Sequence, residues 1–213
     1  MRIALINGSP KGSKSASQVI LNFAKGTLPK YIDFVSINLK DANVKKNVLR
    51  KIAGCDVLIW AFPLYVDAVP SHVLPWFYEL EKYFNDREGP KPRVYALVNC
   101  GFYEADQNEI MLEIIKNWCA KSGLIWGQGI GFGAGGVFYG LRNIPLGKWP
   151  FKNMEKTLKS FAVNLLAEKS APDLFVSPNF PRFSYKIVAE FGWRRAIIRN
   201  GLKLRDLNRK IAL

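Results

Sequence analysis

Residues 3–17 read IALINGSPKGSKSAS: four apolar residues, a turn rich in glycine, serine and lysine, and then a sequence typical of a helix. A buried strand that passes through such a turn into a helix directs backbone N–H groups, hydroxyls and a helix N-terminus at one point, which suits a phosphate. Gly8 and Gly12, with three residues between them, do not match the glycine spacing of the dinucleotide motif Gly-x-Gly-x-x-Gly or of the P-loop. Ser13 also stands where the P-loop has lysine. Two readings remain open: a hydroxyl-rich cradle for a mononucleotide phosphate, and an ordinary polar turn.

Strand-like and helix-like runs alternate along the rest of the chain. Apolar runs rich in β-branched and aromatic residues predict strands at 2–6, 32–37, 56–61, 94–99 and 124–132. Helices are predicted at 17–25, 43–53, 71–84, 104–121 and 153–168. The alternation predicts an α/β fold in which helices cover both faces of one parallel sheet. In such a sheet, ligands bind beyond the carboxyl ends of the strands, where the strand order switches.

Two further loops at this predicted edge have a composition suited to a ligand. The third strand is followed by FPLYVDAVP (residues 62–70), and the fourth ends in NCGFYE (residues 99–104). An aromatic, apolar loop facing a glycine-containing loop can hold a flat ring between them. Tyr65 and Phe102 could instead simply cap the end of the sheet. Three such loops at one edge favour the ligand.

These motifs resemble those of the NAD(P)H-dependent FMN reductase and quinone reductase group, within the flavodoxin-like fold. The resemblance rests on INGSPK (residues 6–11), on SAS (residues 15–17) and on AFPLY (residues 61–65). It implies a doubly wound, five-stranded parallel sheet of order 2-1-3-4-5 in an FMN-binding domain spanning residues 1–170. It also implies FMN-binding residues: Ser9, Lys11, Ser15, Ala16 and Ser17 for the phosphate, and Pro63, Leu64, Tyr65, Val66, Asn99, Cys100, Gly101 and Phe102 for the ring.

The function implied by the resemblance is that of an FMN-dependent NAD(P)H oxidoreductase. The flavin would pass hydride or electrons from NAD(P)H, the co-substrate, to a small-molecule acceptor: a quinone, a nitro or azo compound, or free flavin. Because the flavin carries the chemistry, we assign no catalytic residue, and we expect a homodimer from the resemblance alone. Two alternatives stay open: a flavodoxin-type electron carrier without nicotinamide turnover, and a flavin-free binding protein on the same fold.

Composition limits the remaining function classes. With 213 residues and 49% hydrophobic content, the chain can form one domain with an appendage. No segment has the roughly 20 apolar residues of a membrane span, and no signal peptide is expected. The single histidine and the three widely spaced cysteines support no zinc, iron–sulfur or disulfide site. We therefore expect no metal and a cytoplasmic location.

A glycine-rich segment, GQGIGFGAGG (residues 127–136), contains the dinucleotide spacing at Gly131, Gly133 and Gly136. That motif requires a helix directly after it, and the sequence through Gly147 predicts no clear helix. A flexible loop near the flavin, or a subunit contact, is the favoured interpretation.

The C-terminal residues combine aromatic, aliphatic and basic side chains. Residues 172–213 contain nine Lys and Arg against three Asp and Glu, within a chain of net charge +14. We predict a basic, mostly helical extension over residues 171–213, packed on the domain or on a dimer partner. Weak contact with an anionic membrane surface is an open alternative, and no nucleic-acid partner is expected.

Overall fold

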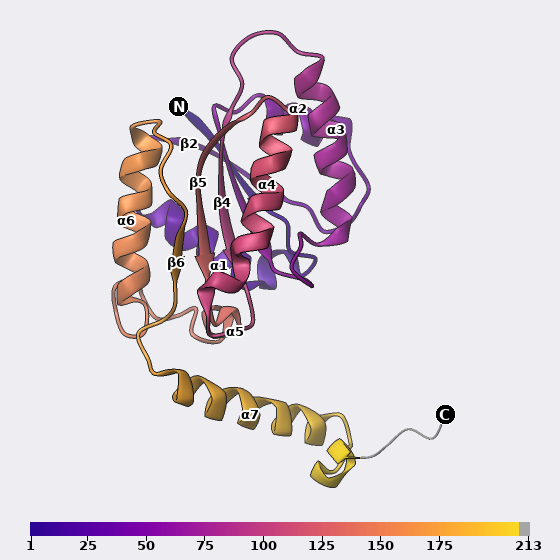
Figure 1. Ribbon diagram of the computed structural model, residues 1–213, viewed down its shortest axis with the longest axis vertical. Helices are drawn as coiled ribbons and strands as arrows, with labels where there is room; N and C mark the ends of the chain where they lie inside the picture. Colours follow the sequence, from indigo (N-terminus) through magenta and orange to yellow (C-terminus); the bar gives the residue numbers. More distant parts are fainter. Residues whose placement is uncertain (209–213) are drawn as a thin grey trace. The chain divides into compact units, whose positions relative to one another are not determined.

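The computed structural model describes residues 1–208, which divide into a unit of residues 1–179 and a second unit that begins at Phe180. The first unit is built on one parallel sheet in the order β2-β1-β3-β4-β5-β6 (Figure 1). Its strands are β1 (Arg2–Asn7), β2 (Asp33–Asn38), β3 (Val57–Pro63), β4 (Arg93–Asn99), β5 (Ile125–Phe132) and β6 (Leu174–Val176). The predicted fold class and the order 2-1-3-4-5 are confirmed.

The prediction of five strands was wrong, because β6 adds a sixth at the edge of the sheet. Its three residues pair with residues 130–132 of β5, and they lie within the segment that we assigned to the C-terminal extension. Pro172 and Pro178 bracket the strand. A run this short has no periodicity that would distinguish it from loop sequence.

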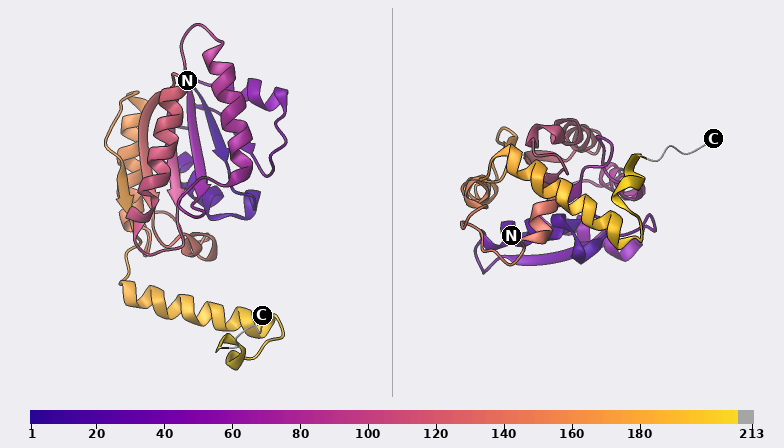
Figure 2. Two further views of the ribbon diagram at one scale, coloured as in Figure 1. Left: turned by 45° about the vertical axis from the view of Figure 1, so that its right-hand side comes forward. Right: turned by 90° about the horizontal axis from the view of Figure 1, so that it is seen from below.

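Helices cover both faces of the sheet (Figures 1 and 2). One face is covered by α2 (Lys46–Ala53), α3 (Leu74–Asn85) and α4 (Glu109–Lys121), and the other by α1 (Ala16–Gly26), α5 (Gly135–Gly140) and α6 (Lys152–Leu166). Short 3₁₀ turns span Gly12–Lys14 (η1), Ser71–Val73 (η2) and Ala105–Asn108 (η3). The predicted helix at 43–53 begins only at Lys46, because the Asn43 N–H is held by the Asp41 carboxylate in a local turn (2.9 Å).

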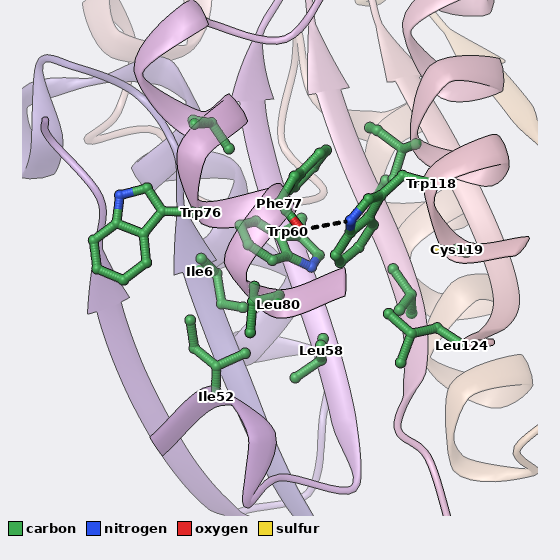
Figure 3. Packing of buried hydrophobic residues seen from close by; sticks show 14 of the residues in the cluster. Ile6, Ile52, Leu58, Trp60, Trp76, Phe77, Leu80, Trp118, Cys119 and Leu124 are labelled. Carbon is green, nitrogen blue, oxygen red and sulfur yellow. Dashed lines mark hydrogen bonds between the residues drawn. The ribbon is translucent and has the colours of Figure 1, made fainter. Parts of the chain in front are cut away.

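An aromatic cluster fixes β3 beneath α3 and α4 (Figure 3). The rings of Phe77 and Trp118 stack with centroids 4.2 Å apart, and Trp60 meets both edge-on at 5.2 and 5.9 Å. Trp118 Nε1 donates to the Phe77 carbonyl (3.0 Å). Each such ring pair adds about 0.5–1.5 kcal/mol beyond its buried area. Because β3 and α3 flank residues 64–70, this cluster also fixes both ends of that loop.

On the opposite face, Tyr95 carries a fully buried phenol. Its ring packs edge-on against Phe161 at 5.3 Å, and its Oη donates to the Lys169 carbonyl (3.3 Å). Burial raises the pKa of Tyr95 from about 10 to about 12. The neutral phenol is thus part of the folded state.

We expect the free energy of unfolding to fall as pH rises from about 10 to about 12. In that range the unfolded chain loses the Tyr95 proton while the folded chain retains it. The free energy of unfolding therefore falls by about 1.4 kcal/mol for each unit by which the folded pKa exceeds the unfolded one. Urea unfolding of the Tyr95→Phe variant should therefore show a shallower loss across this range. Tyr31→Phe, at an 86% exposed phenol, is the matched control. Equal pH dependence in wild type and Tyr95→Phe would contradict the assignment.

The second unit contains α7 (Arg182–Arg199) and a final 3₁₀ segment, η4 (Leu204–Asn208). No residue of α7 is buried. Among the described residues, no helix combines the length and the apolar character needed to cross a membrane.

Candidate functional site

The loops singled out from the sequence follow β1, β3 and β4, which are consecutive in the sheet. Their carboxyl ends therefore meet at one edge. β1 lies between β2 and β3, so the chain changes direction across the sheet at β1. This is the switch point at which open α/β sheets bind ligands.

Asn7 organises the first of these loops. Its Nδ2 lies within 3.3 Å of four oxygen atoms, contributed by Gly12, Ser15, Gln18 and Asn38. The contacts with Gly12 and Ser15 close the turn onto itself. The contact with Gln18 holds the first turn of α1, and the contact with Asn38 ties the turn to the end of β2. The loop is therefore held in one conformation by a single buried amide.

Ser15 caps helix α1. Its Oγ accepts from the Gln18 N–H (3.1 Å) and donates to the Gly12 carbonyl (2.6 Å). Gly12 has a φ of +54°, a conformation that glycine adopts without strain. A side chain at Gly12 would also collide with Lys40, which lies over the turn. Capping and turn geometry together direct the N-terminus of α1 at this loop.

The residues predicted to bind the phosphate occupy this loop and the start of α1. The three serines are buried, Lys11 is exposed and Ala16 is half-buried. The first N–H groups of a helix have no partners within the helix, and the helix dipole favours an anion there. Lysines in and over the turn add positive charge. The N–H groups at the start of α1 and the nearby lysines suit the binding of a phosphate. The individual contacts stay predictions for Ser9, Lys11, Ser15, Ala16 and Ser17.

The second loop turns back on itself in a tight hairpin. Tyr65 and Ala68 exchange backbone hydrogen bonds (3.1 and 3.2 Å), while Val66 and Asp67 both have positive φ, at 50° and 58°. This conformation is costly for a β-branched residue, and such strain concentrates at functional sites. Val66 is 98% exposed and Tyr65 is 43% exposed, whereas Pro63 and Leu64 are half-buried. The hairpin therefore exposes Tyr65 and Val66 at the sheet edge, with the carboxylate of Asp67 beside them.

Asn99, at the end of β4, joins all three loops. Its Nδ2 donates to the Ser17 hydroxyl (2.9 Å) and to the Phe62 carbonyl (2.7 Å), and its own carbonyl accepts from the Leu64 N–H (2.8 Å). The side chain is 5% exposed. Asn99 thus fixes the phosphate loop, the end of β3 and the hairpin relative to one another.

The remaining predicted ring-binding residues differ in exposure. Gly101 and Phe102 are exposed, whereas Cys100 is buried and its thiol approaches the carbonyls of Phe102 and Glu104 (3.6 and 3.4 Å). Burial raises the pKa of the Cys100 thiol. Its N–H and carbonyl are bonded to neighbouring backbone. Among the predicted ring-binding residues of this loop, the accessible surface therefore comes from Gly101 and Phe102.

The loop after β5 supports the β4 loop, which the sequence did not indicate. Ala134, in a left-handed conformation (φ 54°), donates its N–H to the Phe102 carbonyl, and the Gly135 N–H bonds to the Cys100 carbonyl (2.6 Å). A side chain at Gly135 would come within 2.8 Å of Asn99 Oδ1, and one at Gly133 would collide with the Tyr103 carbonyl. These glycines allow close approach of two backbones.

The glycine-rich segment is thus mostly strand β5 and its following turn. The expectation that no clear helix follows it was wrong, since α5 begins at Gly135. Phe138 anchors this six-residue helix: it is fully buried, and its ring lies 5.8 Å from Phe132 and 5.7 Å from Phe151. The burial of one aromatic side chain outweighs the low helix propensity of the surrounding glycines.

Comparison with known proteins agrees with this topology. No protein-family model and no curated protein sequence matches the chain. Among solved structures, an NADPH-quinone reductase from P. pentosaceus matches with a TM-score of 0.52 and 15% identity, over 76% of this chain and 95% of that one. An oxidoreductase from Corynebacterium diphtheriae matches with a TM-score of 0.54 and 13% identity, over 79% and 98%. The chain has a flavodoxin-like fold.

A flavodoxin from Streptococcus pneumoniae also matches, with a TM-score of 0.52 and 12% identity over 78% of this chain and 97% of that one.

Within this flavodoxin-like sheet, sequence reasoning selected Asn99 and missed Asn7 and Asn38. All three are the last residues of their strands. An amide side chain recurring at the carboxyl ends of neighbouring strands is the signal that could have identified them.

Proposed function

We propose that the protein binds FMN at this edge and acts as an NAD(P)H-dependent oxidoreductase. The observation that carries the proposal is the Asn99 side chain, which links Ser17 in the phosphate loop to Phe62 beside the hairpin. The turn proposed to hold the phosphate and the hairpin that carries Tyr65 are thereby held together at one edge of the sheet, as a site for flavin mononucleotide requires. The likeness to an NADPH-quinone reductase and an oxidoreductase supports the same reading.

The residues of this chain would bind and orient the cofactor. The β1–α1 turn and the N-terminus of α1 would hold the phosphate, and the ring would lie between residues 63–66 and residues 99–102. When bound, FMN supplies the transfer of electrons from the nicotinamide to a quinone, a nitro or azo compound, or free flavin. Tyr65 and Phe102, both exposed, would shape the face that receives the second substrate and exclude water from it.

The alternative is an FMN-binding electron carrier that does not react with nicotinamide. The observation that favours it is the likeness to a flavodoxin at a similar TM-score. Both functions use FMN. In the oxidoreductase a nicotinamide, NADH or NADPH, reduces the bound flavin, whereas in the electron carrier neither does.

We expect the purified protein to show, or to acquire on addition of FMN, the visible absorption of an oxidised flavin. Anaerobic addition of NADH or NADPH should bleach this absorption, and a quinone should then sustain NAD(P)H consumption. Bound FMN that neither nicotinamide bleaches would favour the electron carrier. A colourless protein that takes up no added FMN would contradict the cofactor itself.

We further propose a cytoplasmic location. Cys55, Cys100 and Cys119 are all buried and unpaired, which suits a reducing compartment.

A further inference from the structure

Helix α7 exposes an unusual amount of apolar surface. Side chains of this size and apolar character are usually buried in a domain core. In α7, six of them are between 59% and 71% exposed: Phe183, Ile187, Val188, Phe191, Trp193 and Ile198. Phe183, Ile187 and Phe191 are spaced four residues apart and so lie along one side of the helix. Leu202, Leu204 and Leu207 extend the exposed set beyond the helix. Apolar surface of this extent marks an interaction site.

The same segment is strongly basic. Residues 180–213 contain nine Lys and Arg against two Asp and Glu, so half of the chain's net charge of +14 lies here. Both acidic residues have partners within the segment: Glu190 pairs with Arg194 (3.0 Å), and Asp206 accepts from the Lys203 N–H (2.8 Å). The charge that α7 offers to a partner is therefore positive.

Charge decides between the candidate partners. Residues 1–179 also carry a net charge of +7, so a second copy of the chain would present like charge to α7. Nucleic acid would match the charge, but it gives no use for exposed aliphatic side chains such as Ile187, Val188 and Ile198. An anionic lipid surface satisfies both features, because it attracts Lys and Arg and accepts aliphatic and aromatic side chains below the headgroups.

We propose that α7 lies flat on an anionic membrane surface, with Phe183, Ile187 and Phe191 directed into the lipid. At 1.5 Å per residue, its 18 residues extend about 27 Å along the surface. Long basic side chains such as Arg195 and Arg199 can keep their stems among the apolar groups while their charges reach the lipid phosphates. The described helices include none that could cross the bilayer, so the contact is peripheral.

Vesicle binding of the full-length protein tests this proposal. We expect flotation with vesicles that contain phosphatidylglycerol and little flotation with vesicles of phosphatidylcholine alone. The Arg194→Gln/Arg195→Gln/Arg199→Gln variant should bind the anionic vesicles about a hundredfold more weakly, because each basic residue near such a surface contributes about a fivefold change. The matched control is Lys30→Gln/Lys152→Gln/Lys156→Gln, three exposed lysines of residues 1–179, which lowers the total charge equally.

A second variant set separates insertion from simple charge attraction. Phe183→Ser/Ile187→Ser/Phe191→Ser should bind at least about tenfold more weakly while leaving thermal unfolding of the first unit unchanged, since none of these side chains is buried. A tryptophan placed on this side of the helix reports insertion directly: the fluorescence of Phe191→Trp/Trp193→Phe, taken as the difference from Trp193→Phe alone, should shift to the blue on anionic vesicles.

Several outcomes would overturn the proposal. These are equal binding to neutral and anionic vesicles, equal losses in the α7 and control charge variants, and no effect of the serine substitutions. Self-association or nucleic-acid binding without vesicle binding would also do so. All of these readouts are independent of flavin and of NAD(P)H turnover.

Discussion

Substitution of Ser15 by aspartate is expected to weaken FMN binding by at least about a hundredfold. Ser15 Oγ lies inside the turn between β1 and α1, in contact with the Gly12 carbonyl and the Gln18 N–H. A carboxylate there would put a negative charge at the turn that is proposed to hold the phosphate. At an effective dielectric constant of about 20, two like unit charges about 5 Å apart repel by about 3 kcal/mol, which corresponds to about a hundredfold in affinity. The measurement is FMN affinity by fluorescence titration.

Ser15→Asn is the matched control. Asparagine has the shape of aspartate without its charge, and both residues cap helices well, so the start of α1 is preserved in each. Riboflavin, which lacks the phosphate, provides a second control: its affinity should be similar in the two variants. If Ser15→Asp and Ser15→Asn bind FMN equally well, the phosphate does not lie at this turn.

The fold could be predicted from the sequence because strands in a parallel sheet are covered on both faces. Such strands, like residues 57–62 of β3, appear as uninterrupted apolar runs between helical segments. The same reasoning failed for β6, whose three residues gain their conformation only from pairing with β5. It also failed for α5, which depends on the burial of Phe138 between Phe132 and Phe151. In both cases contacts between distant residues override local sequence preference.

The candidate site was predictable to the level of its loops. Topology alone brings the ends of β1, β3 and β4 to one edge, whatever the side chains do. The contacts between loops were not predictable, because they depend on orientation. The sequence does not show that Asn99 turns toward Ser17, or that the thiol of Cys100 turns away from the surface. Gly135 is likewise explained only by its closeness to Asn99 Oδ1.

Replacement of Asn99 by alanine should destabilise the fold by about 2–4 kcal/mol. The change leaves the buried Ser17 hydroxyl and the Phe62 carbonyl without their shared donor, and an unpaired buried polar group costs about 1–3 kcal/mol. Ser17→Ala alone removes one partner and should cost about 1 kcal/mol. The double variant should therefore be less destabilised than the sum of the single variants. Urea unfolding of the four proteins measures the coupling.

Asn99→Asp distinguishes the hydrogen bonds of this side chain from its packing. Aspartate keeps the shape and can still accept from the Ser17 hydroxyl, but it directs a carboxylate oxygen at the Phe62 carbonyl. We expect it to be destabilised as much as Asn99→Ala, and both variants to retain less FMN because the loops are no longer fixed together. Unchanged stability in both variants would refute the bridging role of Asn99. Lower stability with unchanged FMN affinity would instead separate the bridge from the flavin and place the ring-binding surface elsewhere on the sheet edge.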